Sequence, residues 1–254
     1  MIRRLFVSAI AAGVLAGLII SAIHQFTTVP IILHAESFEN EAARAETVTV
    51  DRAIPVGFPL GNPAFPSDPR HLFAHGGETH DGNPAWAPRD GAERIAFTVM
   101  TTVLTGIGFA LVLVAGMMVR GKTVDFRRGV MWGAGGFVAF TLAPTMGLAP
   151  EVPGAAAADL VARQIWWIST AITALAGLWM LVFTPGTAWK VAGVVLLAAP
   201  HVVGAPHPHE LGTGGAPAEL AAQFAATSIA TAAVFWALLG GFAGYFLGRA
   251  QASA

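Results

Sequence analysis

The chain has no cysteine among its 254 residues. Disulfides, thiolate metal sites and cysteine nucleophiles are therefore excluded. Methionine is the only soft metal ligand left, which disfavours a copper(I) site.

Charge is also scarce. Asp, Glu, Lys and Arg make up 11% of the residues, hydrophobic residues make up 55%, and the mean hydropathy is +0.64. A soluble domain is about one quarter charged, so the composition predicts an all-α integral membrane protein. The formal net charge is only −1, and no nucleic-acid partner is expected.

Apolar runs of about 17–25 residues are long enough to cross a bilayer. They predict about six transmembrane helices near Leu5–Ile23, Ile95–Val119, Val130–Leu148, Ile165–Phe183, Val191–Val203 and Phe224–Leu247, of which the fifth is short. The basic start followed by an apolar run also fits a signal peptide, but an uncleaved first span is favoured. The predicted organisation is a first transmembrane helix (1–33), a long outer loop (34–94) and five further helices (95–254).

Basic residues in the short loops predict the orientation, because cytoplasmic loops are enriched in Lys and Arg. One face of the predicted bundle carries Arg3, Arg4, Arg120, Lys122, Arg127, Arg128, Lys190 and Arg249. This face is assigned to the cytoplasm of a bacterial inner membrane, with both termini inside. Every acidic residue except Asp125 then lies outside, where carboxylates attract divalent cations.

The outer loop contains two kinds of sequence. Glu36–Val50 is a candidate short helix, and Asp51–Asp90 is rich in proline and glycine, which predicts irregular structure. A weak repeat relates Ala143–Glu151 to Ala199–His207, so spans three–four and five–six are candidate copies of one helical hairpin.

Glycines recur at four-residue spacing. They are Gly13/Gly17, Gly129/Gly133 and Gly240/Gly244/Gly248. Such spacing lets helices approach closely. Packing within the bundle is the first interpretation, and contact with a partner helix is the alternative.

All eight histidines fall on the predicted outer side. Neutral imidazole is the commonest protein ligand for metals, so this placement favours capture of a divalent cation there. The candidate metal ligands are His24, His34, His71, His75, His80, His201, His207, His209 and Glu210. For the three loop histidines, from His71 to His80, a solvated polar loop is the competing interpretation.

The short fifth span, interrupted at Pro200 and followed by His201, is the strongest single pointer to a site. Pro206-His207-Pro208-His209-Glu210 follows it and presents two imidazoles and a carboxylate on a stiff backbone. Together they predict a relay from the loop into the bundle. The alternatives are a simple proline kink and a histidine that caps a helix C-terminus.

No Asp, Glu, Lys or Arg lies in the middle of a predicted span. Permeation would then rely on backbone carbonyls at the helix breaks and on the side chains of Thr101, Thr102, Thr141, Thr145 and Met146. The run Gly116–Thr123 matches a phosphate-binding loop, but it lacks the required strand–loop–helix context. With no nucleophile–base pair within the spans, the chain is not expected to be an enzyme.

Several segments together resemble the CbtA family of predicted cobalt transporter subunits. They are Pro30–Glu36, Ala85–Arg94, Phe126–Gly129, Leu142–Pro144, Pro150–Gly154, Arg163–Trp167 and Pro200–Pro206. The resemblance implies a cobalt uptake component linked to cobalamin synthesis and a small single-span partner, CbtB, with a histidine-rich tail.

The sequence thus favours an inner-membrane permease subunit for Co²⁺. Imidazole and carboxylate do not separate Co²⁺ from Ni²⁺ or Zn²⁺ by affinity alone, so the metal's identity comes from the resemblance. No permanently bound cofactor is expected; membrane lipid, the metal ion and the CbtB-like subunit are the expected partners. The alternative is a non-transporting membrane scaffold that passes metal to a partner.

The predicted orientation is tested with a topology reporter fused after Ala254. A reporter active only in the cytoplasm should be active there, because the basic loops hold that face inside. A periplasmic reporter, with an unchanged number of spans, would invert the histidine-bearing face and contradict uptake from outside.

Overall fold

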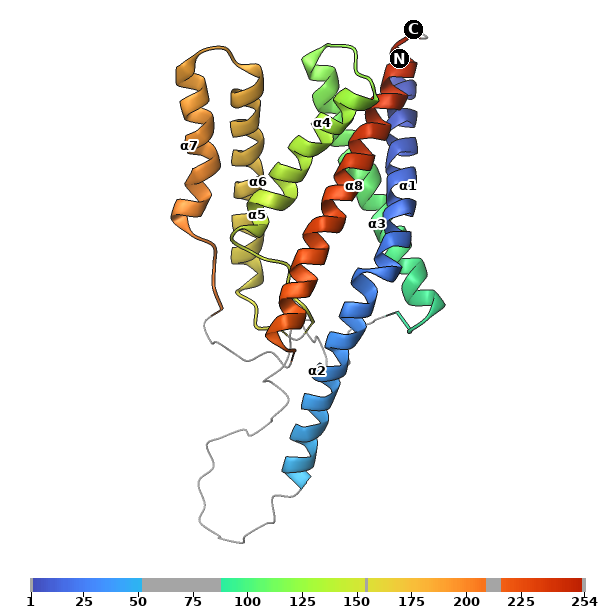
Figure 1. Ribbon diagram of the computed structural model, residues 1–254, viewed down its shortest axis with the longest axis vertical. Helices are drawn as coiled ribbons and strands as arrows, with labels where there is room; N and C mark the ends of the chain where they lie inside the picture. Colours follow the sequence, from blue (N-terminus) through green and yellow to red (C-terminus); the bar gives the residue numbers. More distant parts are fainter. Residues whose placement is uncertain (1, 52–87, 154, 209–215, 253–254) are drawn as a thin grey trace.

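The computed structural model describes residues 2–51, 88–153, 155–208 and 216–252. These residues form helices joined by short connections, with no strand among them (Figure 1). The prediction of an all-α protein is confirmed.

Four of the helices are long and apolar enough to cross a membrane. They are α1 (Ile2–Phe26), α3 (Ala92–Arg120), α6 (Leu160–Phe183) and α8 (Ala218–Ala252). They correspond to the first, second, fourth and sixth predicted spans, which are confirmed as candidate spans.

The other two predicted spans differ from simple long helices. The third consists of α4 (Phe126–Phe137), a π-helical segment η2 (Val138–Leu142) and the short α5 (Ala143–Thr145). The fifth is α7 (Thr187–Val203), whose 17 residues span only about 26 Å at about 1.5 Å per residue. Helix length and hydropathy therefore support four spans and a shorter apolar helix, and do not confirm the count of six.

Local sequence explains several helix ends. The side chains of Asp125 and Asp159 accept hydrogen bonds of 2.8 Å from the backbone N–H groups of Arg128 and Ala162, and so cap α4 and α6. Gly121 ends α3 in the left-handed conformation, with φ of 67°. The run Gly116–Thr123 is thus the end of a helix and its glycine cap, and not a phosphate-binding loop.

Helix α2 (Thr28–Asp51) follows α1 after a break at Thr27. Its first part packs on α8, with Ile31 and Ala35 in one buried cluster with Leu220, and its second part extends beyond the other helices (Figure 1). The helix predicted at Glu36–Val50 is present and begins earlier than expected. Most of the Pro- and Gly-rich stretch, residues 52–87, lies outside the described residues.

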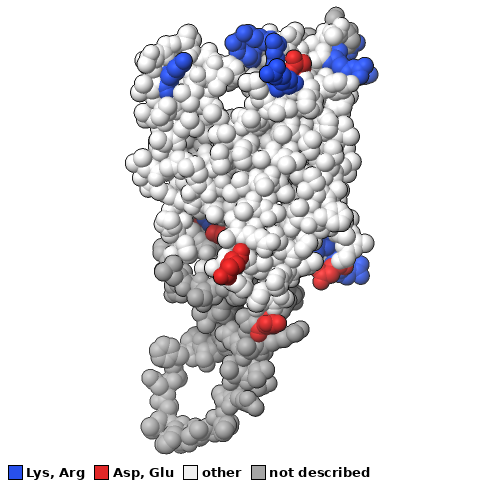
Figure 2. All heavy atoms as spheres, viewed as in Figure 1, with Lys and Arg blue, Asp and Glu red and all other residues white. Residues whose placement is uncertain are grey.

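Charged side chains gather at the two ends of the molecule (Figure 2). The end that holds both termini carries basic residues and a single acidic group, and Asp125, between α3 and α4, belongs to that end. The opposite end carries the other described carboxylates together with arginines, so the predicted segregation of charge is confirmed. We call these the basic end and the acidic end.

Helices meet most closely at glycines, in three pairs that run antiparallel. The facing glycines are Gly13 and Gly106 in α1–α3, Gly133 and Gly240 in α4–α8, and Gly177 and Gly193 in α6–α7. The interpretation of the spaced glycines as packing positions within the bundle is confirmed. The α4–α8 pair joins the third predicted span to the sixth, and the α6–α7 pair joins the fourth to the fifth. Neither of these two pairs falls within one of the two proposed hairpins.

The distances show why a side chain is excluded there. A Cβ atom built on Gly106 would lie 2.7 Å from the carbonyl oxygen of Gly13, and one on Gly240 would lie 2.6 Å from the amide nitrogen of Gly133. Both neighbours are backbone atoms, which cannot move aside as a flexible side chain can. Only glycine permits these helix separations.

The π-helical segment η2 has a structural role. Its Phe140 ring stacks on Trp236 of α8 at 5.6 Å between centroids, and its Thr141 hydroxyl accepts a 3.0 Å hydrogen bond from the Trp236 indole N–H. Phe109 of α3 also contacts the Trp236 ring, at 4.9 Å. An aromatic cluster therefore ties η2 to α3 and α8.

The glycine contacts predict opposite effects for two substitutions on α4. Gly133→Ala should lower the free energy of unfolding by about 1–3 kcal/mol, because the new methyl group meets the backbone of Trp236. Gly135→Ala is the matched control, because a Cβ there has no neighbour within 4 Å. It should be neutral or stabilising by up to about 1 kcal/mol through helix propensity. Equilibrium unfolding in mixed micelles measures both, and equal effects would contradict the packing account.

Candidate metal path

The described residues include four of the nine candidate metal ligands: His24, His34, His201 and His207. The other five, His71, His75, His80, His209 and Glu210, lie outside them. Within the described ranges, no three His, Asp or Glu side chains gather closely enough to hold a metal ion. A complete site at the acidic end would therefore need residues from the segments that are not described.

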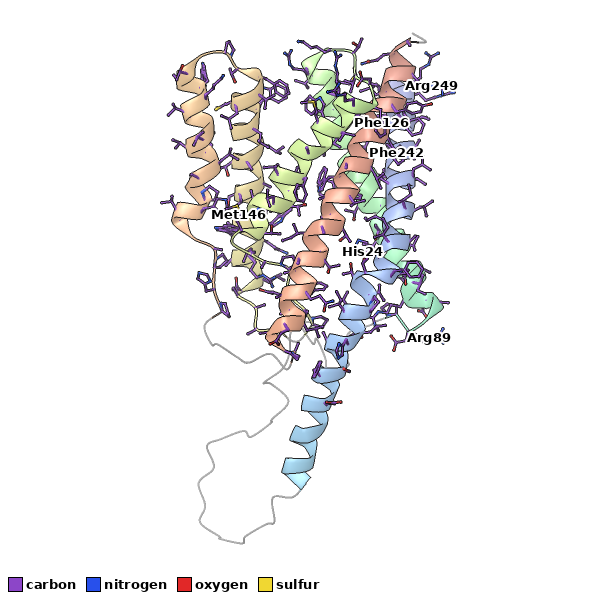
Figure 3. The ribbon with its side chains drawn as sticks, viewed as in Figure 1. His24, Arg89, Phe126, Met146, Phe242 and Arg249 are labelled. Atoms are coloured by element: carbon purple, nitrogen blue, oxygen red, sulfur yellow. The ribbon has the colours of Figure 1, made fainter. Side chains whose placement is uncertain are left out.

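The four described histidines form two separate groups. His24 is half-buried on α1 and His34 is exposed on α2, where its ring lies 5.1 Å from that of Phe38 (His24 is labelled in Figure 3). His201 and His207 lie in the last turn of α7 and in the connection after it. Since α1 and α7 stand on opposite sides of the bundle (Figure 1), these groups do not share a site.

His201 occupies the more informative position. It follows Pro200, which is buried, and its ring meets the ring of Trp166 edge-on, at 6.0 Å between centroids. Trp166 belongs to α6 and is buried. The imidazole therefore packs against α6 where α6 and α7 meet, on the side of this contact that faces the acidic end. It also lies in the last turn of α7, as a histidine that caps the helix would.

Three helical segments meet at this junction. Towards the bundle interior, Ala143 of α5 and Ala174 of α6 share a buried cluster against which Leu197 of α7 packs. Towards the acidic end, a Cβ built on Gly147 would lie 2.7 Å from the Trp166 ring and 2.9 Å from Ala205. The residues after α5 and α7 thus close over Trp166.

Both segments that flank α6 carry a buried proline at this level, Pro144 in α5 and Pro200 in α7. Proline has no amide hydrogen, so neither residue donates a hydrogen bond to the carbonyl group of the preceding turn. Both prolines lie in the weak repeat of the sequence. Their position on either side of one helix depends on tertiary structure and is not visible in that repeat.

The carboxylates of the acidic end are largely paired with arginines. Arg94 of α3 binds both carboxylate oxygens of Glu36 on α2 and lies 3.2 Å from Asp90. Arg163 of α6 lies 3.0 Å from Glu151. The Glu36–Arg94 pair joins residues 58 positions apart in the sequence. These pairs leave less free negative charge for attracting cations than the sequence alone indicates.

An open pocket of about 660 Å³ adjoins the Glu36–Arg94 pair. Its lining includes Thr98, Thr101 and Thr102 of α3. The Thr102 hydroxyl donates a 2.8 Å hydrogen bond to the Thr98 carbonyl oxygen, so one of the predicted permeation hydroxyls already has a partner. Glu36 and Asp90 also line this pocket, and both carboxylates are engaged by Arg94, which would compete with a cation for them.

Two other predicted permeation hydroxyls also have internal partners. Thr141 accepts from Trp236, and Thr145 donates a 3.0 Å hydrogen bond to the Leu142 carbonyl oxygen. Met146 is 71% exposed at the rim of the α5–α6 junction (Figure 3). Besides these hydroxyl oxygens and that of Thr101, which lines the pocket, the carbonyl groups at the proline breaks are candidate ligands within the bundle.

One family model matches residues 2–248, which is nearly the whole chain, and its description is probable cobalt transporter subunit (CbtA). No curated protein and no solved structure matches the chain. A transporter subunit is not an enzyme, in agreement with the missing nucleophile–base pair. With apolar helices, a histidine beside a helix break and a match over almost its full length, the chain belongs to the CbtA family of cobalt transporter subunits.

Proposed function

We propose that this chain is the permease subunit that carries Co²⁺ across the bacterial inner membrane, with the acidic end facing outward. The observation that carries the proposal is the position of His201. It is an imidazole placed directly after the buried Pro200, against Trp166, where three helical segments meet. An imidazole at a helix break can take a cation from the outside and present it to backbone carbonyls within the bundle.

In this proposal the chain crosses the membrane six times. The four long helices cross directly, the combined segment α4–η2–α5 makes the third crossing, and α7 makes the fifth with help from its flanking residues. The gathering of Lys and Arg at the end that holds both termini supports a cytoplasmic location for that end.

The ion would be collected by the residues that follow α7, namely His207, His209 and Glu210. The histidines of the long loop, His71, His75 and His80, form a second candidate group near His24 and His34 in the sequence. Neither group distinguishes Co²⁺ from Ni²⁺ or Zn²⁺ by ligand type, so selectivity for cobalt rests on the family. The metal is cargo and not a resident cofactor. The word subunit in the family description supports a partner chain, which we propose to be a small single-span protein like CbtB.

The relay is tested by the combined substitution His201→Ala, His207→Ala and His209→Ala. Cobalt accumulation in cells that depend on this system should fall at least about tenfold, since even residues that only orient metal ligands change affinity by about 10–100-fold. The matched control is Val202→Ala with Val203→Ala, which alters exposed apolar side chains at the same helix end. Normal Co²⁺ uptake by the triple histidine variant, at equal protein levels, would contradict the relay.

A further inference from the structure

Helix α6 carries two buried polar atoms with no hydrogen-bond partner among the described residues: the indole Nε1 of Trp166 and the hydroxyl of Thr170. Trp166 is 7% exposed and Thr170 is 0% exposed. They are four residues apart, so they lie on the same face of α6, one turn from each other.

Thr170 differs from three other hydroxyl side chains of these helices, which form local hydrogen bonds. Thr231 on α8 and Thr173 on α6 each donate a 2.9 Å hydrogen bond to the carbonyl oxygen four residues earlier, and the Ser21 hydroxyl does the same at 2.7 Å. That local bond is the usual way to satisfy a hydroxyl in a membrane helix. A buried hydroxyl that forgoes it is costly, and such an exception in a native protein points to an absent water or ion.

The neighbours of Thr170 along α6 define its surroundings. One turn inward, Ala174 belongs to the cluster of Ala139 and Ala143, with Leu197 packed against it. One turn outward, Trp166 meets Gly147 and His201. Thr170 therefore lies at the three-helix junction, at the level where both flanking segments carry their prolines.

Backbone chemistry adds oxygen ligands at the same level. The carbonyl groups of the turn before each proline, at Ala139–Phe140 and at Leu196, lose the donor that a proline cannot supply. Helix carbonyls point towards the C-terminal end of their helix, and α5 and α7 both run towards the acidic end (Figure 1). The carbonyl oxygens before Pro144 and Pro200 therefore point in the direction of the acidic end.

We propose that the Thr170 hydroxyl and the carbonyl oxygens before Pro144 and Pro200 form an intramembrane site for a partly hydrated divalent cation, one turn inward of His201. An indole N–H cannot bind a cation, but it can donate to a water of the ion's outer hydration shell, whose lone pairs are available. Trp166 therefore orders this outer water while Thr170 and the carbonyls supply direct oxygen ligands. The site rests on the proposed permease function and specifies where the ion sheds part of its water.

The test compares Thr170→Val, which removes the hydroxyl at nearly constant volume, with Thr170→Ser, which keeps it. Thr231→Val is the matched control, because Thr231 is also buried in a membrane helix but has a local partner. Initial rates of Co²⁺ uptake are measured in cells, and melting temperatures and Co²⁺ binding by equilibrium dialysis are measured on the purified full chain.

Thr170→Val should lower the uptake rate at least tenfold and weaken Co²⁺ binding, with an unchanged or higher melting temperature because an unpaired buried hydroxyl has been removed. Thr170→Ser and Thr231→Val should keep uptake within about twofold of the wild type. Trp166→Phe supplies a second variant that removes the N–H and keeps an aromatic ring, and it should also slow uptake.

Wild-type uptake rates and Co²⁺ binding in both Thr170→Val and Trp166→Phe would overturn the intramembrane site while leaving the permease role intact. If the wild-type protein itself gives no uptake, the permease role fails. In that case weaker Co²⁺ binding by Thr170→Val would still support the site, and unchanged binding would overturn it.

Discussion

Contact between the backbones of glycine-bearing helices is the interaction on which the rest of the bundle depends. Lipid tails are as apolar as leucine side chains, so helices in a membrane gain little from burying apolar surface against each other. The pairs α1–α3, α4–α8 and α6–α7 are instead held where facing glycines bring backbones together. The α6–α7 pair meets the rest of the protein through α6, which contacts α4, η2 and α5. The three-helix junction follows from this arrangement.

The three-helix junction is also where polar groups of these helices lack their usual hydrogen-bond partners. Backbone groups without partners are tolerated within a bilayer only where other protein segments shield them or a polar passage reaches them. Here a π-helical turn, two buried prolines and two unpartnered polar side chains occur around one stretch of α6. Charged groups stay at the two ends. The proposed path through the described helices would therefore be built from neutral ligands.

Much of this architecture is predictable from the sequence, because hydropathy, glycine spacing and the distribution of Lys and Arg act over short distances. Four spans, the packing glycines and the separation of charge between the two ends were predicted and confirmed. The π-helical turn was not, since Val138–Leu142 is an ordinary apolar run whose contact with Trp236 of α8 depends on tertiary structure. The pairing of Glu36 with Arg94, 58 residues away, also depends on tertiary structure.

The candidate site was likewise only partly predictable from the sequence. His201 beside Pro200 was identified from sequence, because a proline within an apolar run and a histidine after it are visible locally. Thr170 was missed, since its lack of a partner depends on how three segments meet around it, and the sequence around it resembles that of Thr173, which has a partner. The histidines of the long loop remain a prediction.

Metal flux through the purified protein tests the central claim most directly. The full chain, alone and together with the proposed small single-span partner, would be reconstituted into liposomes that contain a Co²⁺-sensitive dye. The account predicts a dye signal that rises when Co²⁺ is added outside and that scales with the amount of protein. Co²⁺ binding to these liposomes without any internal signal, with or without the partner, would show a metal-binding scaffold and contradict a permease.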